Sequence, residues 1–67
     1  MNDFIVLHTW ENGDTLAIRK SDVKKIKADF KNDVEISKII TYSEEEYLVY
    51  ESVHLIVAML ETNEKEL

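Results

Sequence analysis

The sequence contains no cysteine and no proline, and its 67 residues include a single glycine. Without cysteine, neither a disulfide nor a thiolate metal centre can stabilise the fold. A single glycine excludes a glycine-rich phosphate-binding loop. A chain this short buries only about 60% of the surface that its unfolded form exposes, and association with another chain is one common remedy. We therefore expect one domain, residues 1–67, with a marginal core.

Long apolar runs are also absent. The longest, residues 55–60, is far shorter than the roughly 20 residues that cross a bilayer. The first ten residues lack the basic region and the cleavage site of a signal peptide. We therefore expect a cytoplasmic protein without membrane insertion.

Acidic residues outnumber basic residues by 14 to 8, which gives a net charge of −6. Residues 19–38 hold seven of the basic residues and four acidic ones, a net of +3, whereas the rest holds ten acidic residues and one basic residue, a net of −9. The overall charge argues against direct binding to nucleic acid. The asymmetry is either ordinary solvated surface or a dipole that attracts a partner.

Apolar alternation and turn signals predict an α+β fold with a bent antiparallel sheet of about five short strands, beginning with a β-hairpin. Residues 4–10 and 15–19 are the expected hairpin strands. Asn12 and Gly13 between them favour a type I′ turn, in which both central residues have positive φ.

The segment after the hairpin has two interpretations. Either Ser21 or Asp22 caps a single helical turn that directs Val23 and Ile26 inward, or the chain continues directly into the third strand. Residues 26–30 are the expected third strand, followed by a turn at residues 31–33. Residues 47–50 form the fifth strand after an acidic turn at residues 43–46. The fourth strand, residues 34–42, is expected to place four residues on one face: Val34, Ile36, Ile40 and Tyr42.

A C-terminal helix is expected to begin at Ser52, a preferred N-cap residue, and to run to about residue 62 or 63. Glu51 would favour the positive end of its dipole. Apolar residues cover roughly 200° of its circumference, about twice the minimum stripe that packs on one core. The side expected to face the sheet holds Val53, Ile56, Val57 and Leu60.

Leu55 and Met59 lie at the flank of this apolar arc. Either the sheet curls around them or another chain covers them. Because an uncovered apolar patch promotes aggregation, we expect the protein to form a homo-oligomer through this flank, with Trp10 as a weaker contact. Trp10 and the tyrosines could also serve as core or cross-strand pairs.

The residues that perform chemistry are sparse. The chain has two histidines, His8 and His54, and neither shows the spacing of a metal site. The serines lie in no nucleophile motif. We therefore expect a non-enzymatic protein with no catalytic residue, no cofactor and no metal.

The segments "NGDTLAI", "SDVKKI", "VEI" and "YLVYESV" resemble the small flagellar FlbD-like proteins linked to swarming motility. Similar short chains also occur as uncharacterised bacterial or phage-type proteins. The resemblance implies an accessory or regulatory role and no catalytic residue. The sequence departs from the family pattern in two places. Arg19 stands where the family has asparagine, and "SEEE" stands where the family has a glycine-bearing turn. The resemblance covers residues 6–56 and rests on Asn12, Gly13, Leu16, Ile18, Val23, Ile26, Val49, Glu51, Ser52 and Val53.

An alternative function follows from a second resemblance. The "ESV" segment in this small acidic chain is similar to the Glu-Ser-Ile segment of phage uracil-DNA glycosylase inhibitors, which mimic DNA with carboxylates. That resemblance implies an acidic inhibitor of a nucleic-acid-binding enzyme. Its candidate surface consists of Glu44, Glu45, Glu46 and Glu51.

Overall fold

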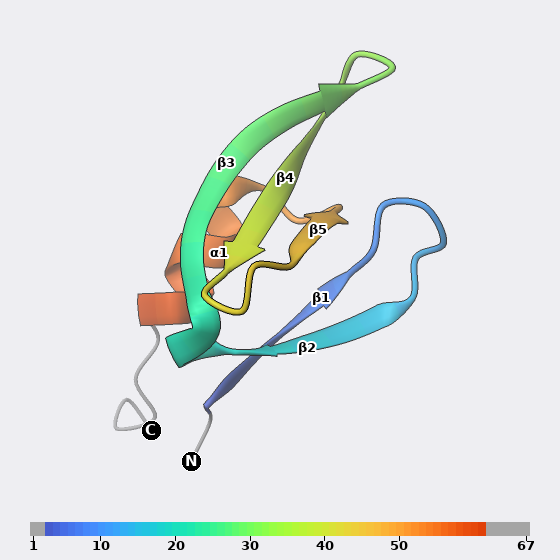
Figure 1. Cartoon of the computed structure of the whole chain (residues 1–67). Coiled ribbons are helices and arrows are strands. Elements are labelled where there is room, and N and C mark those ends of the chain that lie inside the picture. Colours follow the sequence, from blue (N-terminus) through green and yellow to red (C-terminus); the bar gives the residue numbers. More distant parts are fainter. Residues whose placement is uncertain (1–2, 62–67) are drawn as a thin grey trace.

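The computed structural model describes residues 3–61, and its first feature is the expected hairpin (Figure 1). Strands β1 (Phe4–His8) and β2 (Thr15–Arg19) pair antiparallel, with Ile5 opposite Ile18. Because side chains alternate along a strand, Ile5, Leu7 and Ile18 are buried while the residues between them are exposed. The hairpin prediction is confirmed.

The turn of this hairpin differs from the prediction. The Gly13 N–H donates to the Thr9 carbonyl at 2.8 Å, and the Thr9 N–H donates to the Asp14 carbonyl at 2.9 Å. Gly13 has a φ of 72°, but Asn12 does not have a positive φ. The expected type I′ turn is therefore wrong, because a four-residue loop, residues 10–13, needs positive φ only at its last position.

Positive φ at two successive residues occurs at the next hairpin instead. Asn32 and Asp33 have φ values of 53° and 67°, and they connect Lys31 to its partner Val34. These are the backbone angles of a type I′ turn. The predicted turn at residues 31–33 is confirmed. Its type I′ geometry is the one that the sequence predicted for the first hairpin.

Between the hairpins lies η1 (Lys20–Asp22), a single 3-10 turn that leads directly into β3 (Val23–Lys31). The structure therefore combines the two interpretations of this segment: a single helical turn, and a direct continuation into the third strand. No side chain caps η1, so the expected cap at Ser21 or Asp22 is wrong. Val23 and Ile26 are partly buried against the core, as expected.

Strand β4 (Val34–Thr41) is the centre of a second antiparallel sheet, between β3 and β5 (Glu46–Val49). The expected apolar face of this strand is wrong. Val34 and Tyr42 are 45% and 64% exposed, whereas the strand buries Ile36, Ser37, Ile39 and Thr41. The two hydroxyls tolerate burial because both are hydrogen-bonded, Ser37 to the Glu51 carbonyl and Thr41 to the Glu45 backbone.

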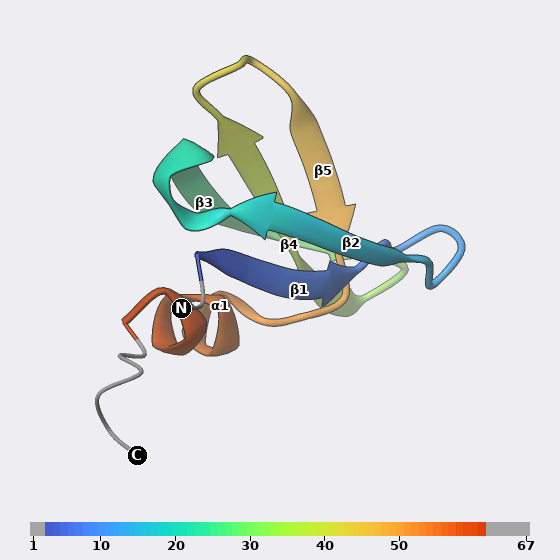
Figure 2. The same cartoon turned by 90° about the horizontal axis from the view of Figure 1, so that it is seen from below.

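The two sheets meet where the end of β1 runs beside β5. Thr9 forms an isolated bridge with Val49, the Trp10 N–H donates to the Leu48 carbonyl, and the Tyr50 N–H donates to the His8 carbonyl. Figure 2 shows β1 crossing close to the end of β5. This junction closes the core, which consists of Ile5, Leu7, Ile18, Ile39, Val49 and Ile56.

Helix α1 (Val53–Glu61) contacts β1 and β3 and completes the α+β fold (Figure 1). The Leu55 N–H donates to the Ser52 hydroxyl at 3.2 Å, so the predicted N-cap is confirmed. The predicted end of the helix, at residue 62 or 63, lies outside the described residues. Within residues 3–61, no helix has the length and apolarity needed to cross a membrane.

Candidate functional site

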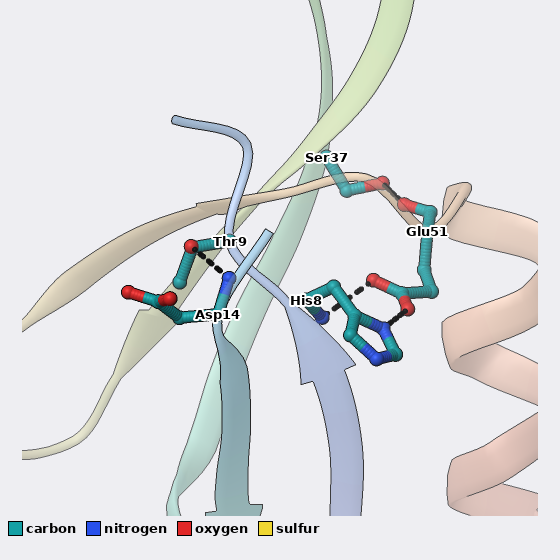
Figure 3. Close-up of polar contacts among 5 residues, drawn as sticks. All are labelled: His8, Thr9, Asp14, Ser37 and Glu51. Atoms are coloured by element: carbon teal, nitrogen blue, oxygen red, sulfur yellow. Dashed lines mark hydrogen bonds and ion pairs between the residues drawn. The ribbon is translucent and has the colours of Figure 1, made fainter. Parts of the chain in front are cut away.

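His8 and Glu51 form a two-point contact between the end of β1 and the segment before α1 (Figure 3). His8 Nδ1 lies 2.7 Å from Glu51 Oε2, and the His8 backbone N–H donates to Oε1 at 3.0 Å. Because a carboxylate only accepts, the ring proton is on Nδ1. The two residues are 43 positions apart, so no local sequence pattern indicated this contact.

The environment of Glu51 favours its charged form. Burial raises the pKa of this carboxyl, but the hydrogen bonds from the His8 ring and backbone outweigh burial and hold the pKa below its ordinary value. The expected effect of Glu51 on the helix dipole stays a prediction; the hydrogen bonds of its carboxylate go to His8. Its carbonyl accepts a bond of 2.6 Å from the buried Ser37 hydroxyl, so β1, β4 and the start of α1 meet at this residue.

The described part of α1 has one buried side and one exposed apolar flank. Ile56 is fully buried, and Leu60 packs partly buried against the core. Leu55 is 48% exposed, as expected from its position on the flank. Met59 is only partly exposed because it also packs against the core. Val57 was expected to face the sheet but is 38% exposed, so that prediction is wrong.

The adjacent strand β1 exposes apolar side chains as well. Phe4 and Val6 are 42% and 51% exposed, and the Arg19 guanidinium lies 4.9 Å from the centre of the Phe4 ring. The apolar run over residues 4–7 predicts burial on both faces at this end of the strand, and that prediction is wrong. Here only one face of β1 is buried.

Trp10 lies at the junction of the sheets rather than on α1. Its ring packs edge-to-face with Tyr50, with centroids 5.1 Å apart and planes at 60°. Trp10 is partly buried and Tyr50 is 51% exposed. Such a pair contributes roughly 0.5–1.5 kcal/mol beyond its burial. The structure thus gives Trp10 an internal partner.

The four candidate acidic residues do not form one surface. Glu44, Glu45 and Glu46 are exposed in and beside the turn before β5, whereas Glu51 follows the other end of that strand and is bonded to His8. Strand β5 and the bend that follows it separate Glu46 from Glu51, and the strand alone spans roughly 10 Å.

The exposed acids of this turn also have partners within the chain. Glu45 accepts a hydrogen bond from the Tyr47 hydroxyl, which raises the pKa of Tyr47. Glu46 lies 3.7 Å from the Lys38 ammonium.

Groups that could perform chemistry stay dispersed. Within residues 3–61, no three His, Asp or Glu side chains are close enough to hold a metal ion. A hollow of about 310 Å³ between the β1–β2 loop and β5 is lined by Glu11, Asp14 and Glu46 among others, and no histidine lines it. The described residues offer contact surfaces.

No family model, no curated protein and no solved structure matches this chain. The resemblances to the FlbD-like proteins and to the glycosylase inhibitors therefore stay predictions, and the functional argument rests on the geometry of the chain itself.

Proposed function

We propose that this chain is a cytoplasmic, non-enzymatic interaction module that self-associates through the exposed flank of α1. The observation that supports the proposal is Leu55, an apolar side chain 48% exposed in the first turn of α1. Ala58 and Met59 lie three and four positions further on, so they border Leu55 on the helix surface. We call these three residues the helix-flank surface.

The neighbouring elements partly cover Met59 but leave Leu55 and Ala58 exposed. Ile56 occupies the core position, so α1 cannot rotate to bury Leu55 without withdrawing Ile56. In a two-fold dimer the same patch lies on both sides of the interface, which would set Leu55 of each copy near the axis. A second copy therefore offers matching apolar chemistry without a further protein.

The net charge of the chain sets the expected salt dependence. At −6, two copies repel each other at long range. Salt screens this repulsion and leaves apolar burial intact. Self-association through the helix-flank surface should therefore be unchanged or stronger in high salt. The acidic-inhibitor alternative predicts the opposite, because carboxylates that replace phosphates lose affinity steeply as salt rises.

Light scattering across a concentration series tests the proposal directly. The wild-type protein should be oligomeric at high micromolar concentration, and Leu55→Glu should be monomeric with the same β signal in circular dichroism. Tyr42→Glu is the matched control, because it removes an exposed apolar side chain and adds the same charge at a residue outside α1. A wild-type protein that stays monomeric at these concentrations contradicts the proposal.

The proposed cellular context is a regulatory or motility-related accessory role, as the FlbD-like resemblance implies. The acidic-inhibitor alternative receives less support from the geometry, since Glu51 is separated from the other three acids and bonded to His8. Affinity capture of bound proteins at low and high salt separates the two functions. Capture of a nucleic-acid-binding enzyme that is lost at high salt would favour the alternative.

A further inference from the structure

A surface other than α1 carries four of the eight basic side chains of the chain. Side chains alternate along a strand, so Lys25, Lys27 and Lys31 of β3 share one face with Asp29; the three lysines are exposed and Asp29 is partly buried. Lys38 on β4 lies directly opposite Lys27 and adds to this lysine row. A hollow of about 220 Å³ beside the row is lined by Lys27, Ala28, Asp29 and Lys38.

The same strand forms an edge of its sheet. β3 pairs with β4 and with no other strand of residues 3–61. Lys31 and Val34 flank the two-residue turn and therefore exchange hydrogen bonds. Counting back by two from Lys31, the backbone groups of Asp29 and Lys27 also point to β4, so those of Ala28 and Phe30 point to the open edge. The Phe30 N–H agrees with this count, because it donates to the Asp29 carboxylate at 2.8 Å, a bond that an added strand would replace at this position.

The face of β3 opposite the lysine row is apolar toward its end. Ala28 is exposed and Phe30 is 64% exposed. Figure 1 shows this end of the β3–β4 hairpin projecting past α1, so the helix does not cover it. A strand added here would meet the lysine row, with Asp29 between Lys27 and Lys31, on one face and apolar side chains on the other. The complementary strand alternates acidic and apolar residues.

Charge decides which occupant fits this edge. Two copies that paired through β3 would bring their lysine rows together, and like charges across strands are unfavourable. The net charge of −6 opposes a nucleic acid, which would also leave the open backbone groups of the edge unused. An acidic peptide uses both the lysine row and the edge.

We propose that the outer edge of β3 binds an extended segment of a partner protein, with alternating acidic and apolar residues, by strand addition. The acidic side chains pair with the lysine row, and the apolar ones pack beside Ala28 and Phe30. This site is separate from the helix-flank surface, so the protein presents one surface to its own copy and another to an acidic partner.

Fluorescence anisotropy with a labelled peptide of alternating Glu and Val, about as long as the 9 residues of β3, tests the proposal. Comparison peptides are the same sequence N-methylated on the residues that face the edge, a scrambled peptide with its Glu residues adjacent, and a single-stranded DNA of similar charge. The alternating peptide should bind, and N-methylation should weaken binding roughly tenfold or more, because it removes the edge hydrogen bonds.

Two charge reversals complete the test. Lys27→Glu should weaken peptide binding by roughly fivefold or more, as attraction becomes repulsion at an exposed pair. Lys24→Glu is the matched control, because Lys24 is exposed but lies at the register irregularity between Val23 and Lys25 and outside the row; it should change binding less than twofold or so. Leu55→Glu should bind the peptide as the wild type does.

Several results would overturn the proposal. These are no binding of the alternating peptide, equal binding of the N-methylated or scrambled peptide, or tighter binding of the DNA. Equal losses from the two lysine reversals would also overturn it, because they would indicate general charge attraction without a defined edge. Circular dichroism of each variant verifies that the strands are intact.

Discussion

The Glu51 carboxylate accepts two hydrogen bonds from His8, one from the ring at 2.7 Å and one from the backbone at 3.0 Å. The backbone N–H is on the last residue of β1, which lies opposite Thr15 of β2 but directs its backbone groups away from β2, so that its carbonyl accepts from the Tyr50 N–H. The acidic side chain therefore satisfies an edge donor that no strand pairs. This contact fixes the start of α1 against the sheet, and with it the orientation of Leu55.

Replacing this carboxylate should measurably destabilise the fold. Glu51→Gln keeps the shape but loses the charge, and its amide cannot accept from both His8 donors. We expect the free energy of unfolding to fall by about 1.5–3 kcal/mol, the range for hydrogen bonds to a charged group. Urea denaturation measures the change. Glu11→Gln, at an exposed residue of the β1–β2 loop, is the control and should leave stability within about 0.5 kcal/mol.

The effect of Glu51→Gln should depend on pH. The folded protein holds the pKa of Glu51 below its ordinary value, so the folded state binds this proton less readily than the unfolded state. The carboxylate then contributes stability above the ordinary pKa of 4.5, and this contribution is lost as the pH falls through the lower folded value. The stability difference between wild type and Glu51→Gln should shrink from pH 7 to pH 3. A constant difference across this range contradicts the assignment.

The sequence predicted the number and order of the strands better than their detailed geometry. Turn residues at 12–13 and 32–33 both marked hairpins correctly, because Gly, Asn and Asp tolerate positive φ. Which loop would form the type I′ turn was not predictable from residue type. That choice depends on strand register, since Thr9 pairs with Val49 and Asp14, and this pairing leaves four residues in the first loop.

Removing the glycine of the first turn should lower the stability of the fold, whereas introducing a glycine into the second turn should raise it. Gly13→Ala places a side chain at φ 72° with no atom within 4 Å of the new Cβ, so only backbone strain opposes it. We expect a loss of about 1 kcal/mol in unfolding free energy. Asp33→Gly relieves the strain at φ 67° and should stabilise by a few tenths of a kcal/mol, after the entropy cost of glycine. Thermal denaturation of both variants measures these changes, and stabilisation by Gly13→Ala would refute the loop geometry.

The features of the candidate site were predictable from the sequence only where they depend on a single helix or strand. The flank position of Leu55 followed from helical periodicity alone. The contact of His8 with Glu51 and the burial of Ser37 did not, because each depends on residues brought together from distant segments. The apolar face of β4 was misassigned for the same reason. Strand β4 buries successive residues, Ile36 and Ser37, which lie on opposite faces of the strand. Its buried hydroxyls have hydrogen-bond partners, so buried and exposed residues do not alternate regularly.

Substitutions at the adjacent residues Leu55 and Ile56 of α1 should have different effects, one on self-association and the other on the stability of the fold. Ile56 is fully buried in the core, and Ile56→Ala should lower the free energy of unfolding by about 2–4 kcal/mol through lost burial and a cavity. Leu55→Ala removes a side chain that is 48% exposed, so the monomer should lose less than about 1 kcal/mol. Measurements at low protein concentration isolate these monomer values. At high micromolar concentration, light scattering should show weakened oligomers for Leu55→Ala, whereas a variant at position 55 that costs as much as Ile56→Ala at low concentration would indicate that Leu55 belongs to the core of its own subunit.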